Sequence, residues 1–312
     1  MVLKPRVVLH PRQPYGIKDF LVGIPNIELL TPDDDPGVLA CLNGGAEILV
    51  THVWEDEYLS PSLRWIASTS AGYDQYPLAR LRENDVRLTT ASGAASIVVA
   101  EHAFALLLSL TRRVGEFSQN MVHRKWEPLV GDELYEKKLA IIGLGRIGEE
   151  IARRASCWGM EVMGLKRNPC AYQGCVRDVR SMDALNAACS WADVLIICAP
   201  GSPGSAPLIS AAELKRLGSG YLINVGRGSL LDLAALAESI SNGQLLGAGL
   251  DVTSPEPLPA DSSLWSSSKV IISAHSAGRS RKYGSRWGDI FSHNLQAFQK
   301  TPRWTNLIEN ER

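Results

Sequence analysis

The sequence has no excess of charge of either sign, because 32 lysines and arginines stand against 33 aspartates and glutamates in 312 residues. A chain so balanced has no electrostatic reason to bind nucleic acid or an anionic membrane surface. It also lacks an uninterrupted apolar run of about 18 residues, the length that a transmembrane helix requires. We therefore expect neither a nucleic-acid partner nor a membrane partner.

Regularly spaced cysteines are absent too, since the six cysteines form no CxxC pair. No set of Cys and His residues has the spacing of zinc ligands, so we expect no metal site. The pattern favours a reducing compartment over a disulfide scaffold, and residues 1–10, interrupted by Pro5, are not typical of a signal peptide. We therefore expect a cytoplasmic protein, in which Cys157, Cys189 and Cys198 are core thiols in apolar segments.

The length and the 45% apolar content predict two domains of ordinary size. Short β-rich runs are followed by helical patterns, and in the second half of the chain these runs do not alternate between apolar and polar residues. Strands of this kind are buried on both faces, which predicts an α/β fold with parallel sheets flanked by helices. The predicted strands are residues 6–9, 46–50, 63–67, 86–89, 139–142, 161–165, 194–199, 221–225, 246–252 and 270–273.

Four helices are predicted with most weight. Residues 96–113 are long and mostly apolar, as in a buried connector between domains. Residues 147–158 have helical periodicity and are followed by Gly159, a plausible C-cap. Residues 233–241 form a third helix. The fourth, residues 282–299, is expected to return to the first domain and make it discontinuous.

A glycine fingerprint follows the predicted strand 139–142 and opens the next helix. Gly143 permits a tight turn, Gly145 lets the backbone approach a pyrophosphate, and Gly148 allows close contact between helix and strand. The helix N-terminus adds unpaired N–H groups. The fingerprint predicts a dinucleotide site that includes Arg146 and Ile147; a glycine-rich structural turn is the alternative.

The end of the next strand bears on the choice of cofactor. Enzymes that use NAD place an Asp or Glu there to bind the ribose hydroxyls. This chain has Lys166 and Arg167 instead, and cations at that position favour the 2′-phosphate of NADP. We therefore predict that NADP(H) is preferred, with NAD(H) as the alternative. Alternatively, Lys166 and Arg167 belong to a solvated basic loop that has no role in cofactor binding.

Three later loops, each at the end of a predicted strand, carry the residues for chemistry. Arg227 would bind a substrate carboxylate and carbonyl through its planar fork. His275 would exchange a proton with the carbonyl oxygen, and Glu256 would orient the imidazole. Singly, the arginine could cap a helix, the glutamate could be a plain loop acid, and the histidine could be a buried core residue. Together, they predict hydride transfer on a 2-keto acid.

These segments closely resemble the D-isomer-specific 2-hydroxyacid dehydrogenases. The resemblance runs from about Leu63 to Ile308 and includes residues 68–74, 100–102, the glycine fingerprint and the three catalytic loops. It implies that Arg227, Glu256 and His275 are catalytic. It also implies that backbone N–H groups at Ala71 and Gly72 bind the substrate carboxylate, which Arg227 and His275 also contact.

The resemblance further implies an architecture of two doubly wound parallel-sheet domains. A flavodoxin-like substrate domain would comprise residues 1–102 and 282–312, with a Rossmann-like cofactor domain inserted at residues 103–281. Members of this family are usually homodimers. Further cofactor contacts are expected at Ala199, Pro200, Val225, Gly226, Asp251, Ala277 and Gly278.

Several positions leave alternatives. Asp251 would lie near the nicotinamide or would cap a turn, and Glu101 and His102 are expected to be structural because they lie on the apolar helix. Tyr73 stands where the family often has a small aliphatic residue, so the rim of the pocket is expected to differ. Residues 1–60 match the family least and help to shape the choice of substrate.

The function predicted is an oxidoreductase that acts on glyoxylate, hydroxypyruvate or a larger 2-keto or 2-hydroxy acid. Glu256 argues against the formate dehydrogenase branch, which carries Gln at the matching position. The phosphite dehydrogenase branch shares Arg, Glu and His, so these residues do not separate it. The alternative from another class is a nucleotide-sensing binding protein, like the C-terminal-binding-protein corepressors on this fold. No long disordered tail, basic patch or peptide motif supports that alternative.

Overall fold

The computed structural model describes residues 4–201, 206–300 and 303–308. The chain forms two compact units, one from residues 1–95 and 279–312 and the other from residues 96–278. The second unit starts seven residues before the predicted boundary at residue 103 and ends three residues before residue 281. The reason at the first boundary is helix α4 (Ser96–Thr111), which runs unbroken and packs on α6 and β11 of the second unit.

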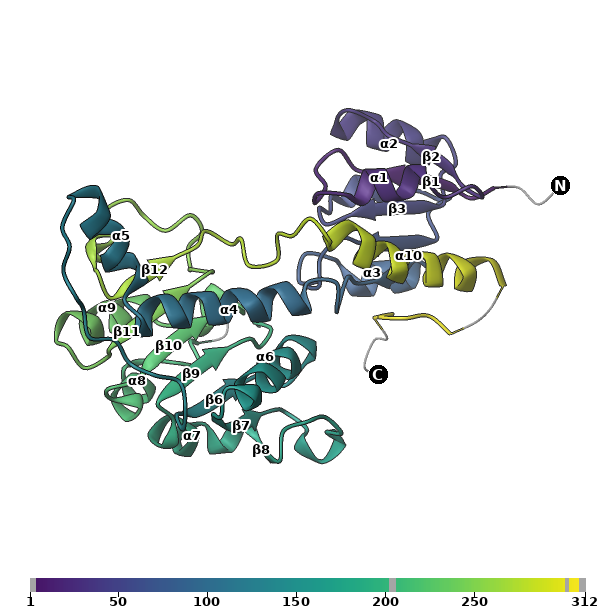
Figure 1. Ribbon diagram of the computed structural model, residues 1–312. Helices are drawn as coiled ribbons and strands as arrows, with labels where there is room; N and C mark the ends of the chain where they lie inside the picture. Colours follow the sequence, from purple (N-terminus) through teal and green to yellow (C-terminus); the bar gives the residue numbers. More distant parts are fainter. Residues whose placement is uncertain (1–3, 202–205, 301–302, 309–312) are drawn as a thin grey trace. The chain divides into compact units, whose positions relative to one another are not determined.

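The first unit is built on a five-stranded parallel sheet in the order β2-β1-β3-β4-β5 (Figure 1). This order is that of flavodoxin-like folds. Its strands are β1 (Arg6–Leu9), β2 (Glu28–Leu30), β3 (Ile48–Thr51), β4 (Trp65–Ser68) and β5 (Arg87–Thr89). Its helices are α1 (Ile17–Val22), α2 (Asp35–Asn43), α3 (Leu78–Glu83) and α10 (Tyr283–Lys300), with a 3-10 turn, η1 (Asp56–Tyr58).

The central strands β1, β3 and β4 are buried on both faces, which explains why they show no polar alternation. Trp65 on β4 stacks on Phe291 of α10 with ring centroids 5.0 Å apart, so α10 closes one face although it lies some 200 residues later in the chain. Two side chains of α10 also bind the end of β4. The Tyr283 hydroxyl donates to the Thr69 carbonyl at 2.7 Å, and the Trp287 indole donates to the Ser68 carbonyl at 3.0 Å.

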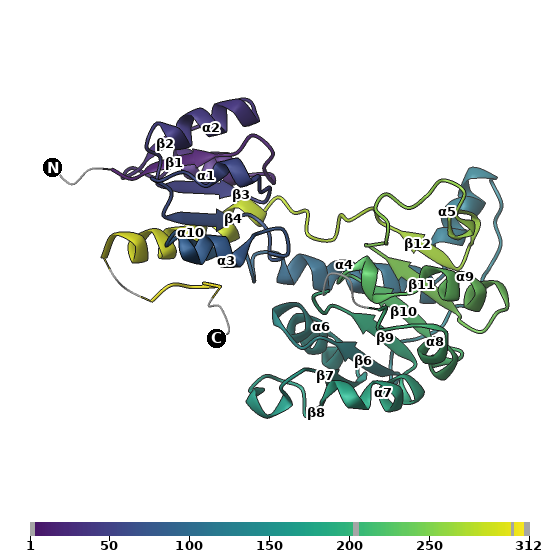
Figure 2. The ribbon, with the colours of Figure 1, turned by 180° about the vertical axis from the view of Figure 1, so that it is seen from behind.

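The second unit has a seven-stranded parallel sheet in the order β12-β11-β10-β9-β6-β7-β8 (Figure 2). Its strands are β6 (Lys138–Ile142), β7 (Glu161–Leu165), β8 (Asp178–Arg180), β9 (Val194–Ile197), β10 (Tyr221–Asn224), β11 (Gly247–Leu250) and β12 (Val270–Ile272). Besides α4, its helices are α5 (Val114–Val122), α6 (Arg146–Cys157), α7 (Leu185–Trp191), α8 (Ala211–Leu217) and α9 (Leu233–Ser241). The 3-10 turns are η2 (Pro169–Ala171), η3 (Met182–Ala184), η4 (Gly228–Leu230) and η5 (Ser263–Ser266).

The strand order of the second unit places a topological switch point between β6 and β9. The chain leaves β6 towards β7 and β8, then returns to β9 on the other side and continues to β12. Helices α4 and α6 cover one face of the sheet, and α7, α8 and α9 cover the other (Figure 1). Open sheets of this kind bind ligands outside the carboxyl ends of the strands at the switch point. The prediction of two doubly wound parallel sheets is confirmed.

The cysteine predictions have mixed outcomes. Cys189 is buried, and the half-buried Cys198 directs its thiol to the Gly143 carbonyl at 3.0 Å, where burial raises the pKa of the thiol to about 12. The prediction for Cys157 is wrong, because this residue is exposed. The buried positions of α6 are spaced three or four residues apart and end at Ala155, so Cys157 falls on the outer face.

Among the residues described, none of the helices has the length and apolarity needed to cross a bilayer.

Candidate active site

The glycine turn between β6 and α6 has a separate structural reason at each glycine. Gly143 has φ of 103°, and a Cβ there would lie 2.8 Å from the backbone of Ala199. At Gly148 a Cβ would lie 2.3 Å from the Gly143 carbonyl oxygen, so only glycine lets α6 pack this close to its own strand. Gly145 differs, because its φ is −101° and a Cβ there would meet no atom of the described residues within 4 Å.

The space beside Gly145 fits the pyrophosphate of a dinucleotide. Gly145 is the N-cap of α6 and offers no side chain to the first N–H groups of the helix, where Arg146 and Ile147 form the first turn. Unpaired N–H groups at a helix N-terminus bind anions. Among the residues that the structure describes, no atom requires a glycine at this position, so the space beside it is open to a ligand group.

The two cations after β7 have different surroundings. The Lys166 ammonium donates to the Leu144 carbonyl at 3.0 Å, and thus ties the end of β7 to the glycine turn. Arg167 is exposed. The pair predicted as one phosphate-binding feature therefore consists of a cation held by the turn and a cation directed to solvent.

The ends of β9 and β10 pack against the glycine turn. Ala199 contacts it, as the Cβ test at Gly143 shows, and a Cβ at Gly226 would lie 2.7 Å from the Ala199 carbonyl oxygen. Val225 is buried, whereas Pro200 is exposed. These four predicted cofactor positions, Ala199, Pro200, Val225 and Gly226, therefore lie at adjacent strand ends.

Arg227 follows β10 on a turn that a buried amide organises. The Asn224 side chain, fully buried, accepts from the Gly226 N–H at 3.0 Å and donates to the Arg227 carbonyl at 3.0 Å. A Cβ at Gly228 would lie 1.9 Å from the Thr253 carbonyl oxygen, so this turn is pressed against the loop after β11. The arginine is thereby brought beside the loop that carries the glutamate.

Glu256 and His275 form the contact that the sequence predicts. The Nδ1 atom of His275 lies 2.8 Å from Oε2 of Glu256, and the other carboxylate oxygen accepts from the Thr253 N–H at 3.1 Å. Both side chains are partly exposed, at 58% and 39%. Because the carboxylate occupies Nδ1, Nε2 is the nitrogen left to exchange a proton with a ligand.

Asp251 follows β11 and is almost fully buried. Its Oδ1 accepts from the backbone N–H groups of Ser276 and Ala277 at 2.7 and 3.0 Å and from the Ser273 hydroxyl at 2.7 Å. Of the two interpretations weighed for this residue, the side-chain contacts are those of an anchor for a turn. Ala277 is buried and Gly278 is half-buried.

The loop predicted to bind the substrate carboxylate belongs to the first unit. Ala71 and Gly72 follow β4; Ala71 is exposed, and the Gly72 carbonyl accepts from the Ser70 hydroxyl at 2.6 Å. Tyr73 is 40% exposed. Sequence reasoning assigned no role to Asn224, Thr253, Ser273 or Ser276, because a short polar residue beside a strand end has no pattern that separates a loop anchor from a surface residue.

Comparison with known proteins relates the chain to one family. The family model described as "D-isomer specific 2-hydroxyacid dehydrogenase, NAD binding domain" matches residues 104–277. A glyoxylate/hydroxypyruvate reductase B of Yersinia pestis is 31% identical over 288 residues, with 88% of this chain and 87% of the relative covered. A glyoxylate reductase of Korarchaeum cryptofilum is 29% identical over 81% of this chain and 78% of the relative.

A solved structure agrees with this relation. The NADPH-dependent glyoxylate/hydroxypyruvate reductase of Sinorhizobium meliloti in complex with citrate has a TM-score of 0.84 and 27% identity, with 97% of each chain covered. A D-isomer specific 2-hydroxyacid dehydrogenase family protein from Aeromonas salmonicida has a TM-score of 0.85 and 28% identity, with 98% of this chain and 99% of that chain covered.

Proposed function

The chain belongs to the family of D-isomer specific 2-hydroxyacid dehydrogenases, and from this premise we propose a role for each residue of its site. It is an NAD(P)-dependent oxidoreductase that transfers a hydride between its cofactor and a small 2-keto or 2-hydroxy acid. The observation that carries the assignment of roles is the 2.8 Å contact between His275 and Glu256, on loops that neighbour the Arg227 turn.

In the direction of reduction, the chain supplies charge and a proton. The bound nicotinamide supplies the hydride that the substrate carbon receives. The Arg227 guanidinium binds the substrate carboxylate through paired N–H groups. His275 donates a proton from Nε2 to the carbonyl oxygen as the hydroxyl forms, and recovers it in oxidation. Glu256 keeps the imidazole oriented through Nδ1 and stabilises its cationic form.

The cofactor is NADP(H), with NAD(H) as the alternative. The solved structures of NADPH-dependent relatives and the absence of an acid after β7 support this preference. We assign the 2′-phosphate to Arg167, which reaches solvent, and give Lys166 the support of the glycine turn, whose Leu144 carbonyl it already binds. Pyrophosphate would lie at the N-terminus of α6, beside Gly145.

Glyoxylate and hydroxypyruvate are the proposed substrates. Two curated relatives are named for reduction of these acids, and each is covered over more than three quarters of its length. Backbone N–H groups at Ala71 and Gly72 would contribute to binding of the carboxylate. A cytoplasmic location is proposed with the reducing conditions that six free cysteines suit.

A homodimer is the proposed assembly. The segment after α4 carries a concentration of exposed apolar side chains, with Phe117, Met121 and Val122 on α5 and Trp126 and Val130 beyond it. Trp126 is 100% exposed. Burial of such a surface stabilises association of subunits. Light scattering on the full chain measures the mass, and a monomer at micromolar concentration would contradict this proposal.

The test of function is steady-state kinetics with glyoxylate, hydroxypyruvate, pyruvate and phenylpyruvate, each with NADPH and NADH. We expect the highest kcat/KM for glyoxylate and hydroxypyruvate with NADPH. Arg227→Ala should lower kcat/KM by about 1000-fold or more, in line with loss of a bidentate charged contact in the transition state. Arg216→Ala, on the exposed surface of α8, is the matched control. Failure of every acid to oxidise either cofactor would refute the function.

The alternative of a nucleotide-sensing binding protein is not favoured. The relatives of this chain by sequence are named as reductases, and the imidazole of His275 is in contact with the carboxylate of Glu256, as the proposed acid–base role requires.

A further inference from the structure

A chain of hydrogen bonds connects helix α4 with the loop that carries His275. We propose that His102 is a positioning residue for proton transfer at His275, acting through Ser273 and Asp251. The proposal rests on the acid–base role assigned to His275 above. The hydrogen bonds of this chain all lie within the second unit.

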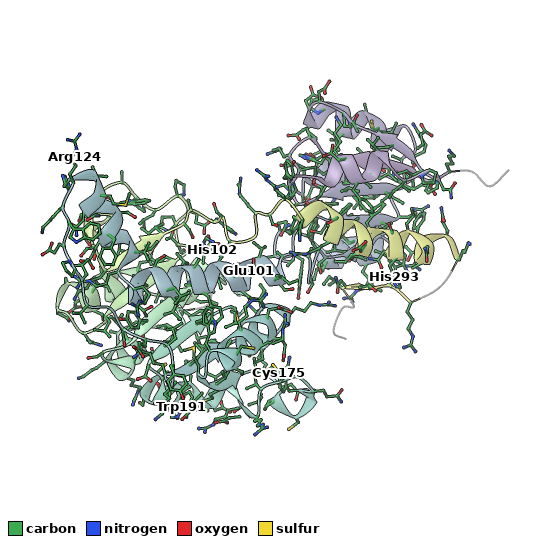
Figure 3. All side chains as sticks on the ribbon, in the orientation of Figure 1. Glu101, His102, Arg124, Cys175, Trp191 and His293 are labelled. Carbon is green, nitrogen blue, oxygen red and sulfur yellow. The ribbon has the colours of Figure 1, made fainter. Side chains whose placement is uncertain are left out.

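The direction of the hydrogen bonds follows from the chemistry of the groups. The Ser273 hydroxyl lies 2.7 Å from Oδ1 of Asp251 and 2.7 Å from Nε2 of His102 (Figure 3 shows His102 on α4). An ionised carboxylate only accepts, so the serine directs its single hydrogen to Asp251. Its oxygen is then the acceptor for His102, whose Nε2 carries the hydrogen. Every donor in the chain therefore faces the aspartate.

The aspartate binds the backbone of His275 and of the two residues that follow it. Its carbonyl accepts from the His275 N–H at 2.6 Å, and its Oδ1 accepts from the next two N–H groups, those of Ser276 and Ala277. Successive N–H groups around one anionic oxygen form a concave anion-binding turn. The loop is thus built around a buried carboxylate that lies on the neighbouring strand end.

This support is needed because the loop is strained where the histidine sits. Ala274 and His275 have φ of 49° and 52°, in the left-handed region that costs a residue with a Cβ about 1–2 kcal/mol. Two such residues in succession persist only where their surroundings hold them. The contacts of Asp251 supply that constraint, and the imidazole direction depends on it.

His102 ties this assembly to the rigid part of the unit. Helix α4 packs on β10, β11 and β12, so its side chains keep a fixed position relative to the sheet. The His102 Nε2 atom lies 3.7 Å from Oδ1 of Asp251 in addition to its contact with the serine. Loss of this donor removes one of the two hydrogen bonds of the Ser273 hydroxyl and loosens the carboxylate that holds the loop. A misplacement of about 1 Å in a catalytic group lowers the rate by up to about 100-fold.

Substitutions at His102 and Ser273 separate a positioning role from packing. His102→Leu removes the N–H donor and keeps the side-chain volume, whereas His102→Gln keeps an N–H donor at a similar distance from the backbone. Ser273→Ala removes the hydroxyl, whereas Ser273→Thr keeps it. We expect His102→Leu and Ser273→Ala each to lower kcat about 10-fold with little change in KM for either substrate. The conservative variants should restore most of kcat. Glu101→Gln, whose acid is exposed and pairs with Arg154 on α6, is the matched control.

The double variant of His102 and Ser273 gives a second criterion. Residues that act in one chain are not additive, so the double variant should lose about as much kcat as either single variant. Three results would overturn the proposal. The first is a wild-type kcat in His102→Leu, and the second is a double variant whose loss of kcat is the product of the two single losses. The third is a fall in KM and in melting temperature that His102→Gln does not reverse.

A spectroscopic measurement separates this proposal from the proposed function. In the cofactor-free chain with labelled histidine, His102→Leu should broaden or split the imidazole resonances of His275, and Glu101→Gln should leave them unchanged. An unaltered His275 spectrum in His102→Leu would overturn the positioning role even in an active enzyme. An inactive wild-type chain would refute the function, while the spectra would still decide the positioning of His275.

Discussion

Two alanine substitutions in the glycine turn should have opposite consequences. Gly148→Ala places a Cβ 2.3 Å from the Gly143 carbonyl oxygen, a backbone atom, so helix or strand must move. Overpacking of this kind costs about 1–3 kcal/mol, and a cost of 2 kcal/mol lowers the melting temperature of a unit of this size by about 4–8 °C. Gly145→Ala adds a methyl that meets nothing within 4 Å in the part of the chain that the structure describes, at a φ that alanine adopts. Its unfolding free energy should change by less than about 0.5 kcal/mol.

The affinity for the cofactor should fall in Gly145→Ala, the variant that leaves the stability of the fold unchanged. The methyl of Gly145→Ala would occupy the space proposed for the pyrophosphate and keep phosphate oxygens from the N–H groups of α6. Loss of such charge-assisted hydrogen bonds costs about 1.5–3 kcal/mol, which raises the Kd for NADPH by about 10- to 100-fold. Thermal denaturation and calorimetric titration with NADPH measure both effects. Gly115→Ala, on α5, is the control for an alanine in open space, because a Cβ there meets none of the described residues within 4 Å.

The reasoning fails if Gly145→Ala binds NADPH as tightly as the wild type, because the space beside this glycine then has no ligand. It also fails if Gly145→Ala lowers the melting temperature as much as Gly148→Ala does, since the two glycines would then serve packing alike.

Two further predictions concern cofactor choice and pH. Arg167→Ala should raise KM for NADPH by about 30-fold and leave KM for NADH unchanged, because a phosphate of charge near −2 about 4 Å from a guanidinium in water contributes about 2 kcal/mol to binding. Lys166→Ala should change KM for both cofactors alike. Equal effects of Arg167→Ala on the two KM values would contradict the assignment of the 2′-phosphate to Arg167. Burial lowers the pKa of His10 and, with the charge of His10, that of His52 below 6.5 in the fold. The stability that their neutral forms contribute is present above pH 6.5 and is lost as the pH falls through that value, so the urea midpoint should decrease from pH 7.5 to 5.5. His52→Gln should flatten this decrease; a midpoint that rises on acidification would show that the sign is wrong.

The longer elements of the fold could be predicted because burial on both faces leaves a pattern. Every residue of β9 and β10 is buried, and such runs of mainly apolar residues occur where a parallel sheet has helices on both sides. Strands β2 and β8 could not be found in this way. Each has three residues at a sheet edge, and their side chains are half-buried or exposed, so no apolar run marks them.

The helices that were missed are short or carry no clear stripe. Helices α1 and α3 have six residues each, and helix α5 has no buried residue at all. Propensity alone does not define helices of this length, because tertiary packing supplies most of their stability. By contrast, α9 was predicted with the bounds that the structure has, since Asp232 caps it and its apolar residues recur at helical spacing.

The residues proposed to contact ligands could be named from the sequence, whereas the residues that hold them in place could not. Arg227, Glu256 and His275 each stand at the end of an apolar run, where parallel sheets place their polar loops. The partner of Ser273 is His102, 171 positions earlier in the chain. No local pattern relates two residues at such a separation, because only the packing of α4 on the sheet brings them together.

The strand order gives a physical reason for the division of roles across the site. Strands β10, β11 and β12 are consecutive in the chain and adjacent in the sheet, so Arg227, Glu256 and His275 necessarily lie on one side of the switch point. The cations after β7 lie on the other side, three strand intervals from β10, or roughly 14 Å at the usual spacing of strands. A dinucleotide laid across this edge would therefore meet Arg167 with its adenosine phosphate and the catalytic loops with its nicotinamide. The glycine turn after β6 lies between them, where the pyrophosphate of such a dinucleotide would cross. An added methyl at Gly145 should therefore weaken binding of the cofactor without lowering the stability of the fold.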